Sequence, residues 1–271
     1  MKKPTELPKP VHLHERVAPA PYMVWAVLFT VVPLLFIAYY AFTDNNFRFT
    51  TENILRFFTA KSVTAGADGT EREVYTYLLI FWRSLKLAVI STAICLVMGY
   101  PIAYIISRTS AKTQKTIITL IMIPMWMNFL IRTYAWMTIL QDTGILNGLL
   151  SLLGLKNVHI IGTESAVVIG MVYDYFPYMV LPIYTTISKL DNRLLEAAQD
   201  LGADSFRVFH SVTIPLIKSA FFSGLVYSFV RSMTAVSAVI FLVSARWKFM
   251  TVHIMSQVEA GFIGPAAAYS L

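Results

Sequence analysis

The sequence is poor in charged residues. Asp, Glu, Lys and Arg make up 14% of its 271 residues, whereas 56% are hydrophobic, and the mean hydropathy is +0.62. Soluble domains carry about 25% charged and about 45–50% apolar residues, because their surface must be hydrated. The shortage of charge excludes an ordinary soluble domain and predicts an all-α protein that crosses a membrane several times.

Cysteine and catalytic motifs are also scarce. The single cysteine, Cys95, lies in an apolar run, which excludes an internal disulfide and a cysteine-based metal site. The sequence has no Gly-x-x-x-x-Gly-Lys-Ser/Thr loop for ATP, and no His-Glu-x-x-His or Gly-x-Ser-x-Gly pattern for hydrolysis. Its net charge of +7 is scattered in short clusters, which argues against nucleic-acid binding. We therefore expect neither an enzyme nor a metal site.

Five apolar stretches are long enough to cross a bilayer, which takes about 20 residues. They are residues 22–42, 85–106, 117–140, 166–187 and 220–243. The chain finishes with a short apolar segment, 266–271, directly after Gly264 and Pro265. We expect this segment to be the start of a truncated sixth span; the alternative is a protein with five spans.

The basic residues predict an orientation. If the N-terminus is cytoplasmic, the inner segments are 1–21, 107–116 and 188–219, and they hold eleven basic against six acidic residues. The outer segments hold nine against eight. Cytoplasmic loops are enriched in Lys and Arg. We therefore predict a cytoplasmic tail at 1–21, a transmembrane domain at 22–271, and a cytoplasmic loop at 188–219 within it.

Three ionisable residues, Arg132, Asp174 and Arg231, fall inside the predicted spans. A charge at this depth costs at least about 2.5–3.5 kcal/mol and normally faces protein or water. One hypothesis is that they line a translocation path. Asp174 with the neighbouring Tyr173, Tyr175 and Tyr178 would suit an organic cation by charge and cation–π attraction, and Arg231 would suit an anion or a chelated ligand. The alternative is that Asp174 pairs with an arginine, and that Arg132 reaches the outer interface.

The loop between the last two predicted spans has a helix-turn-helix pattern. Its first part has an apolar stripe formed by Leu194, Leu195, Ala197, Ala198 and Leu201. A glycine, Gly202, follows where a helix would end, and Asp204 or Ser205 can cap a second helix. The pattern alone also fits an ordinary amphipathic connector at the membrane interface.

The same loop resembles the EAA loop of ABC importer permeases. The matching residues, in order, are Glu196, Ala197, Ala198, Gly202, Val212, Ile214 and Pro215. Val212 and Ile214 stand in place of the family's usual Ile and Leu. In that family the loop is a coupling helix that docks on the ATPase subunit. The resemblance implies that Glu196, Ala197, Ala198, Gly202 and Pro215 couple this chain to an ATPase.

Residues from about 20 to 220 further resemble spermidine/putrescine importer permeases, through the segments 128–137, 144–147 and 178–184. The segment 229–238 instead looks like ferric-iron permeases of the same broad family. Candidate residues of the translocation path are Asn128, Arg132, Tyr173, Asp174 and Arg231.

The resemblance implies a type I permease subunit in the inner membrane of a bacterium, forming half of the path of a polyamine importer. It implies a second permease, two cytoplasmic ATPase subunits, an extracytoplasmic substrate-binding protein and membrane lipid as partners. ATP and Mg²⁺ would be held by the ATPases, and no cofactor by this chain. The alternatives are another substrate, such as ferric iron, or a self-sufficient secondary transporter.

Overall fold

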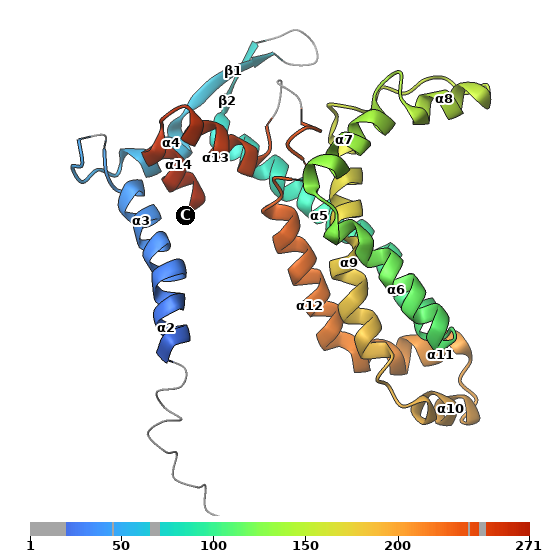
Figure 1. The fold of residues 1–271 in the computed structure, drawn as a ribbon. Helices are drawn as coiled ribbons and strands as arrows, with labels where there is room; N and C mark the ends of the chain where they lie inside the picture. Colours follow the sequence, from blue (N-terminus) through green and yellow to red (C-terminus); the bar gives the residue numbers. More distant parts are fainter. Residues whose placement is uncertain (1–19, 45, 66–70, 238, 244–247) are drawn as a thin grey trace, which may run out of the picture. The chain divides into compact units, whose positions relative to one another are not determined.

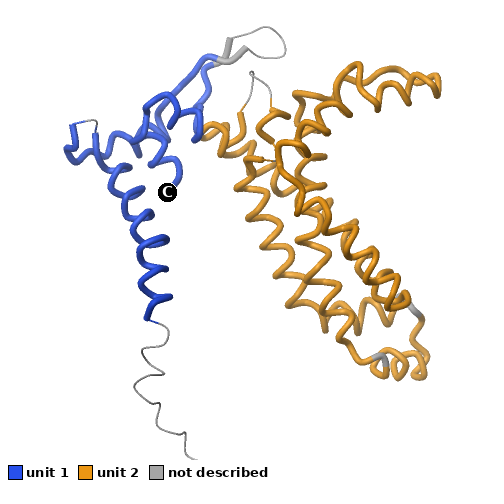
Figure 2. The backbone as a smooth tube through the Cα atoms, viewed as in Figure 1, with its two compact units in different colours: residues 1–77, 254–271 blue, residues 78–253 orange. Residues whose placement is uncertain are grey.

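The computed structural model describes residues 20–44, 46–65, 71–237, 239–243 and 248–271. The predicted tail at 1–21 therefore lies almost entirely outside the described residues. The chain forms two compact units, residues 1–77 with 254–271, and residues 78–253 (Figure 2). The described elements are helical except for one two-stranded hairpin, so the predicted all-α class is confirmed (Figure 1).

The first unit begins with one long apolar helix. It consists of α2 (Ala20–Ala26), the π-helical turn η1 (Val27–Val31) and α3 (Val32–Ala41). The π-helical turn lies directly before Pro33, whose ring removes a backbone donor. Together these elements form a 22-residue candidate span, Ala20–Ala41, which confirms the first predicted stretch.

The rest of the first unit packs around the end of α3. Here lie α4 (Glu52–Thr59), the antiparallel strands β1 (Lys61–Ala65) and β2 (Glu71–Tyr75), and α14 (Ile263–Ser270). Helix α14 packs against α3 and α4. Its Tyr269 hydroxyl donates to the Tyr77 carbonyl over 3.0 Å. The final apolar segment of the sequence is therefore helical, as predicted.

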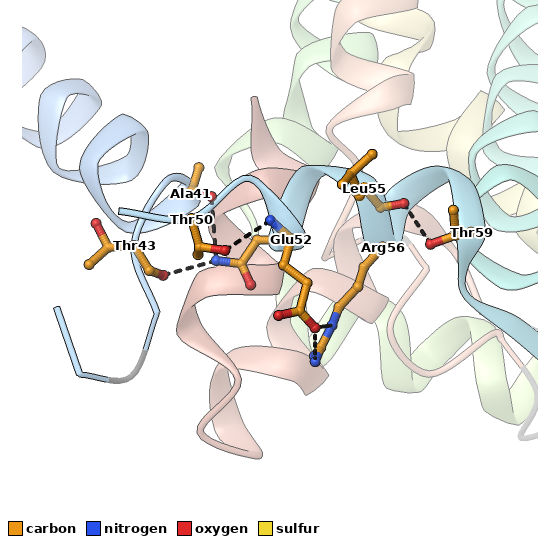
Figure 3. A network of polar contacts seen from close by, with 8 residues as sticks. Ala41, Thr43, Thr50, Glu52, Leu55, Arg56 and Thr59 are labelled. Carbon is orange, nitrogen blue, oxygen red and sulfur yellow. Dashed lines mark hydrogen bonds and ion pairs between the residues drawn. The ribbon is translucent and has the colours of Figure 1, made fainter. Parts of the chain in front are cut away.

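A polar network fastens α4 to the end of α3 (Figure 3). The buried Asn53 amide donates to the carbonyl of Thr43 over 2.9 Å and to the carbonyl of Ala41, the last residue of α3, over 3.4 Å. Glu52 pairs with Arg56 one turn later at 2.8 Å. A Cβ added at Gly264 would lie 2.6 Å from the Asn53 amide nitrogen, so α14 approaches this network closely because residue 264 has no side chain.

The second unit is a helical bundle around α9. Its elements are α5 (Thr76–Ser107, which starts in the first unit), α6 (Ala111–Trp126), α7 (Phe129–Leu140), α8 (Ile145–Leu152), α9 (Glu164–Ile187), α10 (Asn192–Asp200), α11 (Ser205–Val208), the π-helical turn η2 (Phe209–Thr213), α12 (Ile214–Met233) and α13 (Met250–Glu259, which ends in the first unit). Helix α9 packs against α12, α6 and α7 (Figure 1). Gly99 of α5 and Gly224 of α12 both lie against Met179 of α9, where an added Cβ would come within 3.2–3.3 Å of its side chain.

The predicted third span is wrong as a continuous helix. Helix α6 and the segment Phe129–Leu152, which holds α7 and α8, meet at a bend of 98°. Pro124 lacks a backbone donor near the end of α6. The Asn128 side chain then accepts the backbone N–H of Leu130 over 2.9 Å and caps the start of α7. Hydropathy predicts one continuous span here because the residues on both sides of the bend are apolar.

The predicted fifth span is shifted. The structure places a continuous helix over Phe209–Met233, eleven residues ahead of the predicted start at 220. The described residues between 234 and 243 form turns instead. Thr234 ends the helix, and its hydroxyl donates to the Val230 carbonyl over 2.8 Å. The described part of the chain thus holds four helices long and apolar enough to cross a membrane, or five if the bent pair is one span.

Candidate functional site

An ion pair between Arg132 of α7 and Asp174 of α9 lies in the second unit. The Arg132 Nε lies 2.8 Å from Asp174 Oδ1, and Nη2 donates to Oδ2 over 3.0 Å. The side chains of Asp174 and Arg132 are only 5% and 12% exposed. The predicted pairing of Asp174 with an arginine is confirmed. Because the two charges compensate each other, neither is an isolated charge in the cavity.

The same arginine fastens the bend between α6 and α7. Its Nη1 donates to the carbonyl of Pro124 over 2.6 Å, in the last turn of α6, where carbonyls lack helical partners. Next to it, the Thr133 hydroxyl lies 2.9 Å from the Ser237 carbonyl, to which it can donate. The bend starts a new helix at Phe129, and this places Arg132 beside α9. That Arg132 extends to the outer interface stays a prediction.

Arg231 of α12 has a different environment. Its guanidinium carbon lies 5.2 Å from the ring centroid of Tyr178 on α9 and 5.4 Å from that of Tyr227 on α12. Its Nη2 also donates to the Tyr227 hydroxyl over 3.2 Å. The two rings meet edge to face with centroids 5.0 Å apart. Aromatic faces attract cations at such distances, so two tyrosines hold this exposed arginine.

These groups share one cavity of about 400 Å³. Its lining residues are Met125, Phe129, Arg132, Asp174, Tyr175, Tyr178, Arg231, Thr234, Val236 and Ser237. Three of the five candidate path residues are therefore brought together. The charged lining residues carry a net charge of +1, because Asp174 balances only one of the two arginines.

The other two candidates lie elsewhere. Asn128 caps α7, and Tyr173 lines a separate apolar groove of about 580 Å³ between α5, α6 and α9, with its ring edge to face on Trp136. Conversely, Thr234 and Tyr227 were not predicted from the sequence. Tyr227 had a recognisable signal, since it precedes Arg231 by four residues and so shares its helix face.

The predicted helix-turn-helix in the 188–219 loop is confirmed. Asp191 caps α10 by accepting the Arg193 N–H over 3.0 Å. Gly202 ends the turn with φ +84°, and Ala203 N–H donates back to the Ala198 carbonyl over 3.1 Å. Asp204 then caps α11 by accepting the Arg207 N–H over 2.7 Å. Of the two predicted capping residues, Asp204 and Ser205, it is therefore the side chain of Asp204 that caps the helix.

The predicted apolar stripe of α10 does not face one way. Leu195 is 5% exposed, whereas Leu201 is 90% exposed. Leu194, Glu196 and Ala197 are also exposed. The loop thus presents aliphatic side chains that the described part of the chain leaves exposed.

A hollow of about 410 Å³ lies within the same loop, lined by Gly202, Asp204, Arg207, His210 and Ser211. The loop is joined to the bundle through Phe209, whose ring packs edge to face on Tyr100 and Tyr104 of α5 at 5.0 and 5.8 Å. Directly after Phe209–Thr213, Pro215 lies in the first turn of α12. The loop and the cavity are therefore linked by one continuous helix, Phe209–Met233.

Membrane-length helices around a cavity with charged walls define a multi-pass membrane transport protein. Residues 96–271 match the family described as "Binding-protein-dependent transport system inner membrane component". The chain belongs to this family and is thus an inner-membrane component of such a transport system.

Individual relatives agree with this assignment. A spermidine/putrescine transport system permease protein, PotB, of Haemophilus influenzae is 36% identical, over 74% of this chain and 68% of its own length. A ferric transport system permease protein, FbpB, of Actinobacillus pleuropneumoniae is 31% identical, over 66% of this chain but 24% of its own length. Among solved structures, a chain of a bacterial alginate ABC transporter in complex with a periplasmic protein has the same fold, with a TM-score of 0.77, 16% identity, and coverage of 94% of this chain and 86% of that one.

Proposed function

We propose that this chain is a permease subunit of an ATP-driven, binding-protein-dependent importer of polyamines such as spermidine and putrescine. It forms half of the translocation pathway. The observation that carries the proposal is the 36% identity with the spermidine/putrescine permease over most of both chains. The fold is shared with an ABC transporter chain over 94% of this chain, which is consistent with the proposal.

The cavity supplies the chemistry for this proposal. A polyamine is a flexible cation with primary and secondary ammonium groups, and it is attracted by aromatic faces. Tyr178 lines the cavity and Tyr227 borders it through Arg231. Asp174 is already neutralised by Arg132, so we assign that pair to holding the bend rather than to direct charge recognition.

The 188–219 loop is proposed as the ATPase-coupling element, on the cytoplasmic side together with the N-terminal tail. Glu196, Ala197 and Leu201 are exposed and available to an ATPase cleft, while Ala198 and Gly202 shape the turn. Because the end of the loop and Arg231 belong to one helix, Phe209–Met233, a displacement of the loop would be transmitted to Arg231. This supports coupling through Pro215 and α12.

The proposed partners follow from this division of work. Two ATPase subunits hold ATP and Mg²⁺, a second permease completes the path, lipid surrounds the spans, and an extracytoplasmic binding protein delivers the substrate. The chain itself carries no catalytic residue in this scheme.

The test is uptake of radiolabelled spermidine into proteoliposomes that contain the complete transporter, ATP inside and binding protein outside. We expect uptake to need both ATP and this chain. Import of a ferric chelate without spermidine import would contradict the polyamine assignment. Uptake by this chain alone, driven by an ion gradient, would contradict the importer assignment and support the secondary transporter.

A ferric-iron importer is the second candidate function. It is favoured by one observation, the net charge of +1 on the cavity walls, since an anionic iron chelate would be attracted to Arg231. The same proteoliposomes, supplied with ferric citrate in place of spermidine, separate the two candidates.

A further inference from the structure

We infer that Tyr178 and Tyr227 form a binding site for a substituted ammonium group, and that Arg231 occupies this site as a tethered cation until the substrate displaces it. The inference rests on the proposed polyamine function and deepens it. It assigns the recognition of the substrate to two aromatic faces rather than to a carboxylate.

The geometry of the two rings carries the first step. They come from different helices, Tyr178 from α9 and Tyr227 from α12, and meet edge to face at 5.0 Å. The Arg231 guanidinium lies within 5.2–5.4 Å of both centroids. A cation within about 6 Å of a ring centroid is attracted by the ring. An alkylammonium group placed where the guanidinium now lies would therefore contact the same two faces.

The second step is that Arg231 can leave. It is exposed, and its contacts in the described structure are the two rings and one hydrogen bond to the Tyr227 hydroxyl. The one carboxylate that lines the cavity, Asp174, is held at two points by Arg132. Cation–π contacts are weak at exposed positions. An incoming ammonium group thus competes with a loosely bound side chain, not with an ion pair.

The third step concerns charge. With Arg231 on the tyrosines the cavity walls carry a net charge of +1, which repels a polycation. If Arg231 moves off the rings, the substrate gains the aromatic faces and loses the nearest like charge at once. Arg132 cannot play this role, because its three polar contacts hold it between Pro124 and Asp174.

The experiment measures equilibrium binding of radiolabelled spermidine, and separately of tetramethylammonium, to the purified transporter complex without its binding protein. Arg231→Gln removes the competing charge and should tighten binding of both probes by roughly 3- to 30-fold. Arg231→Lys keeps a cation and should bind within about 2-fold of wild type. Tyr178→Leu and Tyr227→Leu should weaken binding by roughly 3- to 30-fold, whereas Tyr178→Phe, which keeps the aromatic face, should not.

The chain offers a matched control. The guanidinium carbon of Arg108 lies 5.2 Å from the ring centroid of Tyr104, the same distance as that of Arg231 from Tyr178. Tyr104 precedes Arg108 by four residues, just as Tyr227 precedes Arg231. Arg108 does not line the cavity. Arg108→Gln should leave the binding of both probes unchanged. Co-purification of the partner subunits with each variant shows that the complex has assembled.

Two outcomes would overturn the inference: weaker binding of both probes in assembled Arg231→Gln, or unchanged binding in both Tyr→Leu variants. Binding of ferric citrate that Arg231→Gln abolishes would also overturn it, since Arg231 would then be an anion ligand. Failure of the proposed function is seen separately, because spermidine uptake by the wild-type transporter does not depend on any of these variants. If that uptake is absent, the tetramethylammonium measurements alone test whether Tyr178 and Tyr227 bind a substituted ammonium group.

Discussion

The cavity between α9 and α12 and the 188–219 loop both belong to the second unit. Charged side chains are buried and paired in the cavity, whereas aliphatic side chains are exposed in the loop. In the cavity, two buried charges, Arg132 and Asp174, find each other across two helices. In the loop, the aliphatic Leu201 is 90% exposed, with no cover from the residues that the structure describes. The buried ion pair is completed within the bundle, whereas Leu201 in the loop stays open to solvent.

This difference indicates where the chain depends on partners. A buried ion pair must be complete for the bundle to fold, because one partner left alone is an uncompensated charge. An exposed leucine costs little by itself, and scattered exposed apolar residues are common. Substitutions in the cavity pair should therefore change stability first, and those on the exposed face of the loop should change coupling first.

The largest expected effect tests the cavity side of this comparison. Asp174→Asn leaves Arg132 buried without its counter-charge, and we expect it to destabilise the complex by about 3–5 kcal/mol. The double variant Arg132→Gln with Asp174→Asn removes both charges and should recover much of that stability. Thermal unfolding of the detergent-solubilised complex measures both. If the single variant unfolds at the wild-type temperature, the ion pair does not hold the bundle.

A pair of leucines tests the loop. Leu195 is buried and Leu201 is not, so Leu195→Ala should lower the free energy of unfolding by about 2 kcal/mol. Leu201→Ala should change it by less than about 0.5 kcal/mol. Thermal unfolding gives these values, and crosslinking to the ATPase subunits gives the docking. We expect Leu201→Ala to lose crosslinking while remaining folded. Retained crosslinking and normal ATP-driven uptake would show that Leu201 is not part of the docking surface.

Gly202 offers a smaller change at the same loop. Its φ of +84° is costly for a residue with a Cβ, so Gly202→Ala should destabilise the turn by about 1–2 kcal/mol. Gly148 in α8 is the control, because an added Cβ meets nothing within 4 Å there. Spermidine uptake should fall with Gly202→Ala and stay near wild type with Gly148→Ala, at equal amounts in the membrane. Equal uptake by both variants would count against a coupling role for the turn.

The smallest effect concerns the hydrogen bond that joins the bend to residue 237. Thr133→Val removes a hydroxyl that lies 2.7 Å from the Phe129 carbonyl one turn earlier and 2.9 Å from the Ser237 carbonyl, and should cost about 1 kcal/mol. Thr138→Val is the control on the same helix, since its hydroxyl bonds only the Tyr134 carbonyl one turn earlier. Thermal unfolding of the two variants should differ. Identical midpoints would show that this contact does not contribute to the bend.

Much of the fold was predictable because hydropathy reports directly on burial in lipid. The spans Ala20–Ala41 and Glu164–Ile187 agree with the predicted stretches within a few residues. The helix-turn-helix was predictable because Gly202 and Asp204 act locally, through a left-handed backbone and a side-chain cap. The bend at Asn128 was missed, since an apolar average is insensitive to one proline and one capping residue.

The sequence predicted which charged residues belong to the candidate site, but not which residues they contact. Hydropathy singled out Arg132, Asp174 and Arg231 as charges in apolar surroundings, and all three line one cavity. The sequence could not predict which arginine pairs with Asp174, because Arg132 and Arg231 have the same side chain and both lie in apolar runs. The 98° bend decides it by turning Arg132 toward α9.

By itself, the sequence determined the apolar spans, the loop with its capped turn, and the three charges that need an explanation. These depend on local chemistry: hydration of side chains, backbone freedom at glycine, and hydrogen bonds over a few residues. Only the tertiary structure decided that Arg132 is neutralised while Arg231 rests on Tyr178 and Tyr227. Asp174 and Tyr178 lie on α9, a different helix from either arginine, and contacts across helices depend on distances that only packing and the bend establish.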